Sequence, residues 1–368
     1  CLCCAPVMPK SMPAYFCLLL AMPGCVSTPI LQEPTPMPSS KALVIGHRGA
    51  SALRPEHTLA AYAKAIEDGA DLIEPELVST QDGVLIARHE NEISGTTDVA
   101  QRPEFISRKV TKIIDGEPVT GWFTEDFSLT ELKTLRARER LPELRSTAFD
   151  GEFEIATLDE IIALAAEASA EHERVIGLAP EIKHPSHFAA LGLAMENKLL
   201  AALRSHPHTR AAPVIIQSFE IANLQELRGR IGSDSNISLL QLYGRADDHP
   251  YDTVIAGAPV RYGSMMTVDG LLQVATYADA IGLAYRDLSP MDGRSRLVDD
   301  AHAAGLKVIV YTFRPENHFL DGVLRGDGGA AARHEAGSIA QIRAHLALGI
   351  DAFFTDDPAL GRQAVDGL

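Results

Sequence analysis

The stretch that decides the fold is ALVIGHRGASALRPEHTLAAYAKAIEDGADLIEPEL, residues 42–77. It contains two short apolar runs, 42–47 and 71–77, separated by an Ala- and Leu-rich segment that predicts a helix over 57–68. Continuous apolar runs of this length, alternating with helices, are typical of parallel strands buried on both faces of a sheet. The stretch therefore predicts a strand–helix–strand unit of a parallel sheet.

The same alternation of apolar runs and helical segments continues to the end of the chain. Six further apolar runs are predicted as strands: 174–182, 213–219, 237–243, 280–285, 306–313 and 350–355. Further helices are predicted over 157–170, 187–205, 219–229, 294–304 and 337–348. Eight strands with helices between them, in a chain of 368 residues, predict an α/β fold of the (β/α)8 TIM-barrel type. A doubly wound open sheet is the alternative, but no GxGxxG motif follows the first strand.

One part of the predicted barrel turns back on itself. Residues 76–90, ELVSTQDGVLIARHE, hold two β runs joined by Asp82-Gly83, and so short a connection predicts an antiparallel hairpin. A two-residue loop would place His89 opposite Glu76, and a four-residue loop would place it opposite Glu74. Directly opposite residues share a face, so either register predicts an acidic neighbour for His89.

A long polar segment follows the hairpin. Residues 91–150 carry many charges, a turn at Asp115-Gly116 and the only tryptophan, Trp122. Connections this long in compact domains are often functional. We interpret the segment as an insertion that covers one end of a barrel domain spanning residues 41–368.

The composition limits the classes of partner. The chain carries a net charge of −16, with 22% charged and 46% hydrophobic residues, which is ordinary for a soluble globular protein apart from its acidity. Nucleic acid and anionic lipid both require neutralising cations, so we expect a small-molecule partner and no nucleic acid. An anionic small substrate would need local positive charge or a bound metal ion.

The first 40 residues are predicted to lie outside the barrel. All five cysteines occur by Cys25, so the rest of the chain can form no disulfide. Lys10 precedes an apolar stretch, 15–22, with the length of a signal-peptide core. Residues 1–25 therefore predict a leader for export to the periplasm, with Cys25 as a lipid anchor and the only membrane contact. Residues 26–40, rich in Pro, Ser and Thr, predict a flexible linker.

Polar side chains gather where the predicted strands end. They are His47, Arg48, Glu74, Glu76, His89, Glu181, Lys183, Gln217, Ser218, Tyr311, Thr312, Arg314, Asp356 and Asp357. The carboxyl ends of barrel strands meet at one rim, where active sites of this fold are built. We therefore expect these side chains to converge.

Three of the carboxylates are predicted to hold a metal ion. Glu74 and Glu76 alternate along one strand and so point to the same side, and Glu181 ends a neighbouring strand. Crowded carboxylates are unfavourable unless protons or a cation relieve their repulsion. Oxygen ligands favour a hard divalent cation, with Ca²⁺ preferred and Mg²⁺ possible. A salt-bridged rim is the alternative interpretation.

Two histidines are candidates for proton transfer. His47 and His89 each end a β run beside a charged residue, and imidazole titrates near neutral pH. His57 and His187 are interpreted as structural. His57 can simply open a helix, and His187 follows Glu181 where it could cap a helix.

Cationic and polar groups at the same rim are candidates for substrate binding. Arg48 and Lys183 can hold phosphate oxygens, or they can pair with the nearby glutamates. We expect substrate contacts from Arg48, Lys183, Glu56, Gln217 and Tyr311.

These motifs, in this order, resemble one known family. The run HRGASALRPEHTLAAYAKAIEDGADLIEPELVSTQDGVLIARHENEISGTTDVA (47–100) is similar to glycerophosphodiester phosphodiesterases. The similarity continues in PEIKHP (180–185), QSF (217–219), VYTFR (310–314) and FFTDDP (353–358). It covers residues 42 to 358 and resembles the exported bacterial branch of the family.

The resemblance implies a TIM barrel that hydrolyses glycerophosphodiesters, such as glycerophosphocholine and glycerophosphoethanolamine, to sn-glycerol 3-phosphate and an alcohol. It implies one divalent cation held by Glu74, Glu76 and Glu181. It also implies His47 and His89 as the acid–base pair and Arg48 and Lys183 as phosphate contacts. Two positions differ from the usual family pattern: Glu76 stands where Asp is usual, and Glu90 follows His89 where Asp is often found.

The reaction route and two rival functions stay open. The nucleophile is either water or the neighbouring glycerol hydroxyl, which would give a cyclic intermediate; we expect His47 to act first as base and His89 as acid. A phospholipase D-like phosphodiesterase acting on lysolipids is one rival, and it would need an apolar groove that the polar insertion does not predict. A non-enzymatic surface binding protein is the other, disfavoured by the retained histidines and carboxylates.

Overall fold

The structure is a computed structural model that describes residues 41–232, 234, 236–288 and 295–367. The predicted leader (1–25) and linker (26–40) lie outside the described residues. Residues from Lys41 onward belong to one compact unit.

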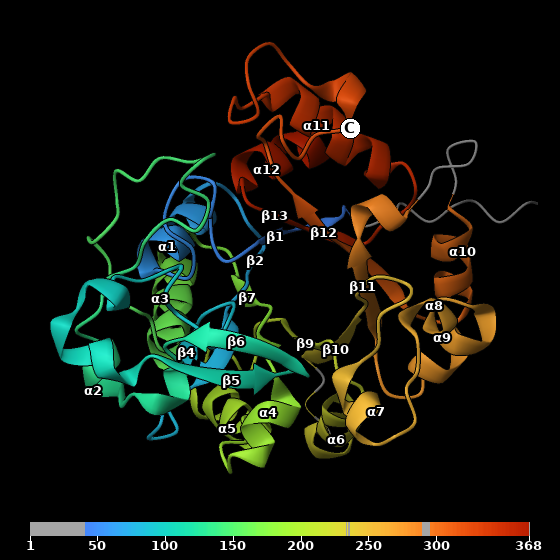
Figure 1. Cartoon of the computed structure of the whole chain (residues 1–368). Coiled ribbons are helices and arrows are strands. Elements are labelled where there is room, and N and C mark those ends of the chain that lie inside the picture. The colour runs from blue at the N-terminus through green and yellow to red at the C-terminus, as the bar shows by residue number, and fades with distance from the viewer. Residues whose placement is uncertain (1–40, 233, 235, 289–294, 368) are drawn as a thin grey trace, which may run out of the picture. The chain divides into compact units, whose positions relative to one another are not determined.

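A closed parallel barrel forms the centre of this unit (Figure 1). Its strands are β1 (Leu43–Gly46), β2 (Leu72–Ile73) continued by β3 (Glu76–Ser79), β7 (Gly177–Leu178) continued by β8 (Glu181–Ile182), β9 (Val214–Ser218), β10 (Ile237–Leu242), β11 (Ala280–Ala284), β12 (Lys307–Phe313) and β13 (Ala352–Thr355). β1 pairs with both β2 and β13, and β9 pairs with β10, which closes the ring. The prediction of a (β/α)8 barrel is confirmed.

Two barrel strands are interrupted at a proline. The predicted strand 71–77 breaks between β2 and β3 at Pro75, and 174–182 breaks between β7 and β8 at Pro180. Proline has no N–H to donate to the ladder. Beyond the breaks the pairing resumes, with Glu76 in register with Glu181, and Glu181 in register with Gln217. The interruption therefore places three polar side chains side by side at the rim.

Helices surround the barrel in Figure 1. They are α1 (Leu59–Glu67), α3 (Leu158–Glu171), α4 (Pro185–Ala190), α5 (Glu196–Ser205), α6 (Ala222–Ile231), α7 (Tyr251–Ile255), α8 (Tyr262–Met265), α9 (Val268–Val274), α10 (Arg296–Ala303), α11 (Glu335–Leu346) and α12 (Pro358–Asp366). The predicted helix 187–205 is two helices, α4 and α5, and α7, α8, α9 and α12 were not predicted. Helix α1 begins after Thr58, whose Oγ1 accepts a hydrogen bond from the Ala61 N–H, and not at His57.

The predicted hairpin is present, but both predicted registers are wrong. β3 pairs antiparallel with β4 (Leu85–Ala87), with Val78 opposite Ile86. The Thr80 N–H donates to the Val84 carbonyl at 3.0 Å, so the loop has three residues. From the sequence we predicted a loop of either two or four residues. Counting on from this register puts His89 opposite Pro75 and not opposite a glutamate.

The inserted segment 91–150 contains short 3₁₀ helices and a second hairpin, joined by irregular chain. β5 (Val110–Ile114) and β6 (Glu117–Gly121) are joined at Asp115 and Gly116, whose φ angles are 47° and 89°. The turn predicted at this dipeptide is present, and two positive φ angles in a row are typical of a type I′ hairpin turn. Trp122 is buried and donates its indole N–H to the Phe105 carbonyl at 2.7 Å. The short helix α2 (Leu129–Leu132) follows.

Two apolar layers stabilise the barrel. The inner cluster consists of Ile45, Leu72, Ala179, Leu240, Leu242, Ala280, Ile309, Ala352 and Phe354. A larger cluster lies between the strands and the surrounding helices. The first and last barrel strands are neighbours, and Lys41 before β1 pairs with Asp366 at the end of α12, Nζ to Oδ1 3.0 Å. No helix within the described ranges has the length and apolarity needed to span a bilayer.

Candidate active site

Most of the predicted site residues line one cavity at the carboxyl ends of the barrel strands. This cavity, of about 150 Å³, is lined by His47, Arg48, Glu76, His89, Glu181, Lys183, Gln217, Phe219, Leu242, Tyr311, Thr312, Arg314 and Phe354. Two predicted site residues do not line the cavity but contact residues that do. Glu74 contacts His47 and Gln217, and Glu56 contacts Arg48. The convergence expected from strand ends is therefore present.

Glu74, Glu76 and His47 form the tightest cluster of possible metal-ligating groups among the described residues. One ligand atom from each lies within 4.8 Å of the others, and all three side chains are buried. Gln217 donates its Nε2–H to Glu74 Oε1 at 2.8 Å. The third predicted ligand, Glu181, pairs with Lys183, Oε1 to Nζ 3.0 Å, and is the strand neighbour of Glu76.

The donor set fits a hard cation. Burial, together with the nearby Glu76 and Glu181 carboxylates, raises the pKa of Glu74 well above its usual range. Burial also raises the pKa of Glu181 to about 7, against the opposing effect of Lys183. Both shifts show that burial and the crowding of carboxylates outweigh the positive charge and hydrogen bonds nearby. The Gln217 Oε1 atom is buried without a hydrogen-bond partner, which leaves one more oxygen donor beside this cluster.

His57, which the sequence suggested was structural, is a direct partner of Glu76. It is fully buried, with its Nε2 2.7 Å from Glu76 Oε2 and its Nδ1 2.8 Å from the Tyr62 hydroxyl. Arg48 Nε lies 3.1 Å from the same Glu76 Oε2. Although burial alone would raise it, the pKa of Glu76 is held well below its usual range by Arg48 and by further positive and hydrogen-bonding neighbours. His57 and Arg48 thus hold one carboxylate oxygen of Glu76, a residue that lines the cavity.

His47 is oriented by Asp356, one of the strand-end residues expected at the rim, for which the sequence predicts no role. His47 Nδ1 lies 2.5 Å from Asp356 Oδ1. Asp356 Oδ2 in turn accepts hydrogen bonds from Arg145 Nη2 at 2.5 Å and Arg314 Nε at 3.0 Å. Because Asp356 is held ionised, it favours the tautomer of His47 that carries its proton on Nδ1 and leaves a lone pair on Nε2.

His89 lies at the end of a chain of alternating imidazoles and carboxylates. Its Nδ1 is 2.5 Å from Glu90 Oε1, and Glu90 Oε2 is 3.3 Å from His184 Nε2. His184 Nδ1 is 2.6 Å from Asp115 Oδ2, in the turn of the β5–β6 hairpin. The acidic neighbour expected for His89 is therefore present, but it is Glu90 and not a glutamate of the paired strand.

Burial and neighbouring cations keep both candidate acid–base histidines neutral at neutral pH. Burial and then the neighbouring Arg48 lower the pKa of His47 to about 4. Burial, Arg48 and Lys183 lower the pKa of His89 to about 3. A neutral imidazole can accept a proton at once, whereas an acid role requires negative charge to arrive with the substrate.

Arg48 and Lys183 bring positive charge to the cavity. Arg48 has a positive φ of 58°, a backbone conformation that non-glycine residues rarely adopt. Its backbone N–H donates to Glu74 and its Nη1 to Glu56, at 3.1 and 3.0 Å. Lys183 Nζ pairs with Glu181 and lies 5.7 Å from the centre of the Phe219 ring. The sequence left two possibilities for Arg48 and Lys183, phosphate binding or pairing with nearby glutamates. Both side chains pair with glutamates and also line the cavity.

Sequence and structure comparisons point to one group of proteins. Residues 47–360 match the glycerophosphoryl diester phosphodiesterase family. A glycerophosphodiester phosphodiesterase of Arabidopsis thaliana is 33% identical over 330 residues, which cover 82% of this chain and 85% of that protein. The enzyme of the same name from Haemophilus influenzae is 27% identical over 277 residues, which cover 70% of this chain and 73% of that protein. The structure of a phosphodiesterase of Oleispira antarctica, solved with the product sn-glycerol-3-phosphate, is similar with a TM-score of 0.54 at 20% identity. The match covers 89% of this chain and 97% of that chain.

Proposed function

The chain belongs to the glycerophosphoryl diester phosphodiesterase family and is a glycerophosphodiester phosphodiesterase; from that premise we propose how its site works and on what. It hydrolyses glycerophosphodiesters such as glycerophosphocholine and glycerophosphoethanolamine to sn-glycerol 3-phosphate and an alcohol. The observation that carries this proposal is the cluster of His47, Glu74 and Glu76 within 4.8 Å in a cavity that Arg48, Lys183 and His89 also line.

The cluster of carboxylates is proposed to hold one divalent cation through Glu74, Glu76 and Glu181. When bound, this cation neutralises charge on the phosphate. Arg48 and Lys183 hold the remaining phosphate oxygens and stabilise the negative charge that grows in the transition state. Gln217 and Tyr311 line the same cavity and orient the substrate, while Glu56 supports the guanidinium of Arg48.

His47 is proposed to act first as base and His89 as acid. The Nε2 atom of His47 carries the lone pair, because Asp356 engages Nδ1, and it takes the proton of the nucleophile. An anionic phosphodiester offsets the two cations that lower the pKa of His89, so His89 can hold the proton that the leaving alcohol requires. If the nucleophile is the glycerol hydroxyl, ³¹P NMR during turnover should detect a five-membered cyclic phosphate; direct attack by water gives none.

Removal of divalent cations tests the metal assignment. Treatment with a chelator should abolish hydrolysis of glycerophosphocholine, and Ca²⁺ should restore it more fully than Mg²⁺, because three carboxylates suit the larger ion. Glu76→Gln should raise the cation concentration needed for half-maximal activity. An enzyme that keeps its full rate in excess chelator would contradict the assignment.

Two alanine variants test the acid–base pair. His47→Ala and His89→Ala should each lower kcat by at least about 100-fold, the usual contribution of general acid–base catalysis, with an unchanged circular dichroism spectrum. Calorimetric titration with Ca²⁺ separates the roles, since His47→Ala should still bind the cation. Loss of cation binding in His47→Ala would make this histidine a ligand, and full activity in either variant would remove it from catalysis.

We propose that the leader exports the protein to the periplasm and that Cys25 anchors it to lipid. The arrangement of Lys10, the apolar stretch 15–22 and Cys25 supports this proposal. In bacterial fractionation, the protein should follow the membrane fraction and Cys25→Ser should move it to the soluble periplasmic fraction. Identical fractionation of both proteins would exclude the lipid anchor.

A further inference from the structure

A second and larger cavity adjoins the catalytic one. It has a volume of about 710 Å³ and shares Glu181, Lys183 and Phe219 with the catalytic cavity. A phosphodiester has two substituents, and the catalytic cavity of about 150 Å³ is too small to hold both together with the phosphate. With the phosphate beside Lys183, one substituent must extend past Phe219 into the larger cavity.

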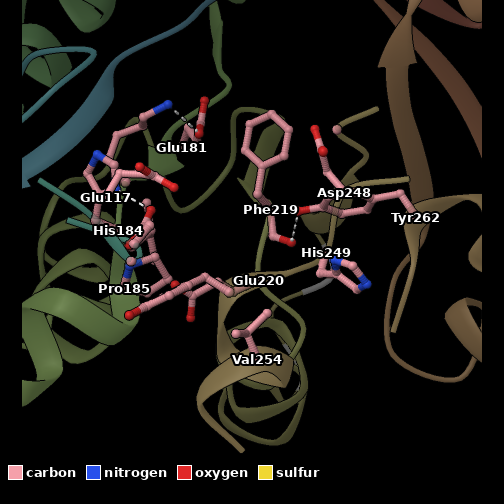
Figure 2. Close-up of a pocket in the computed structure, with 16 residues that line it drawn as sticks. Glu117, Glu181, His184, Pro185, Phe219, Glu220, Asp248, His249, Val254 and Tyr262 are labelled. Atoms are coloured by element: carbon pink, nitrogen blue, oxygen red, sulfur yellow. Dashed lines mark hydrogen bonds and ion pairs between the residues drawn. The ribbon is translucent and has the colours of Figure 1, made fainter. Parts of the chain in front are cut away.

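The larger cavity has two opposing walls, which Figure 2 shows. Glu117, His184 and Pro185 lie on one side together with Glu181, and Phe219, Asp248, His249 and Tyr262 lie on the other. The first wall comes from β8, the start of β6 and the start of α4. The second comes from the residue after β9, the connection between β10 and α7, and α8. The inserted segment therefore helps to enclose the space that receives the substituent.

The charges of this cavity are arranged asymmetrically. Its two cationic side chains already have partners, Lys183 with Glu181 and His184 with Asp115. Within the described ranges, neither Glu117 nor Asp248 has a basic group within 4.0 Å. The catalytic end thus offers a cation to the phosphate, while the outer end offers carboxylates.

The wall beside Asp248 is aromatic. The rings of Phe219 and Tyr262 are 6.4 Å apart at an interplanar angle of 79°, so they form a corner. The Tyr262 hydroxyl donates to the Phe219 carbonyl at 3.1 Å, which fixes the two rings relative to each other. Tyr251 also lines this cavity. Faces of aromatic rings attract organic cations, including quaternary ammonium groups that can donate no hydrogen bond.

We propose that this cavity is the subsite for the alcohol half of the substrate and that it selects a cationic amino alcohol. The inference rests on the proposed function, because it assumes a phosphodiester held at Lys183. A choline or ethanolamine substituent would place its ammonium group against the Phe219–Tyr262 corner, with Glu117 and Asp248 supplying the compensating negative charge. An anionic substituent is repelled, and a neutral polyol gains neither attraction.

The test compares two substrates that differ in the charge of the alcohol. Glycerophosphocholine should have at least about fivefold higher kcat/KM than glycerophosphoglycerol at low salt, the ratio expected from cation–π contacts and partly exposed charges. In the double variant Glu117→Gln/Asp248→Asn, which leaves the aromatic corner intact, this ratio should fall about threefold, mainly through KM for glycerophosphocholine. Choline should also inhibit more strongly than 3,3-dimethyl-1-butanol, its uncharged isostere.

Asp247→Asn is the matched control. Asp247 is the neighbour of Asp248 and does not line the cavity, and its side chain is 92% exposed. The control removes one negative charge where the double variant removes two, and it should leave the substrate ratio within twofold of wild type. Equal kcat/KM for the two substrates, or a ratio that is unchanged in the double variant, would overturn the subsite. Failure to hydrolyse either substrate with metal present would instead overturn the proposed function.

Discussion

At the scale of single residues, the partner of His47 is the most consequential side chain to which sequence reasoning assigned no role. Asp356→Asn should lower kcat by about 100-fold or more while changing KM little, because the imidazole loses the group that fixes its tautomer. Steady-state kinetics on glycerophosphocholine measure this.

Asp357→Asn provides the control for this substitution. Asp357 caps α12 by accepting the Leu360 N–H and pairs with Arg333, so its loss should lower thermal stability and leave kcat close to wild type. Similar kcat losses in both variants would show that Asp356 acts only through folding.

His57 gives a second prediction at this scale. His57→Leu should weaken cation binding by about 10- to 100-fold, the usual effect of removing a group that orients a metal ligand, because Glu76 loses the contact at 2.7 Å. His57→Gln retains a donor and should lose less. Calorimetric titration with Ca²⁺ or Mg²⁺ checks both, and unaltered affinity in His57→Leu would assign His57 to packing alone.

Sequence reasoning found the site residues that lie at the ends of apolar strands, and it missed those whose position depends on the tertiary fold. Glu74, Glu76 and Glu181 were found because a charge at the end of an apolar strand is visible locally. Asp356 was expected at the rim, and its contact with His47 could have been predicted by one further step, since closing a barrel places the end of β13 beside the end of β1. Arg145 lies in the irregular insertion, where no periodicity indicates which side chain turns inward.

At the scale of elements, the β5–β6 hairpin links its turn to His184. Burial alone would lower the pKa of His184, but hydrogen bonds to Asp115 and Glu90 raise it to about 9, from an ordinary value of 6.5. A histidine whose pKa is raised by folding stabilises the native state fully below about pH 6.5 and loses this contribution as the pH rises through about 9. The contact therefore stabilises the attachment of the hairpin at neutral and acid pH.

Asp115→Asn should test this attachment. The variant should be less stable than wild type at pH 6, and the difference should nearly vanish at pH 10. Chemical denaturation at the two pH values measures it. Glu117→Gln, at the same turn but without an ion pair among the described residues, is the control and should show no such pH dependence.

Helices and strands were predicted correctly where the sequence of the segment alone indicates its structure. The barrel strands are buried on both faces, so their apolar runs mark them without reference to neighbours. The helix 187–205 was wrong because helical composition continues through the turn after α4, where Gly192 has a φ of 73°. The hairpin register was wrong because three-residue loops were not considered, although Gly83 with a φ of 82° suits such a loop.

At the scale of the whole described unit, α12 covers the strand that bears His47. Its Leu360, Ala364 and Val365 are buried, and the helix packs against β1 and α11. Burying these side chains contributes about 4 kcal/mol, a large share of the roughly 5–15 kcal/mol that stabilises a typical domain. A chain that ends at Asp357 should therefore lose cooperative thermal unfolding and activity together. A chain that ends at Asp366 should retain both, and a truncation at Asp357 that still melts cooperatively would contradict this role.

The neighbouring positions of Lys41 and Asp366 have a practical consequence. The amino end of β1 lies at the floor of the barrel, opposite the rim where substrate enters, and the Lys41–Asp366 pair brings the end of α12 to the same place. A short peptide could join these two positions, so circular permutants opened at an exposed loop on the floor should fold. For the same reason, a fluorescent protein or a solid support attached after α12 would leave the catalytic mouth unobstructed.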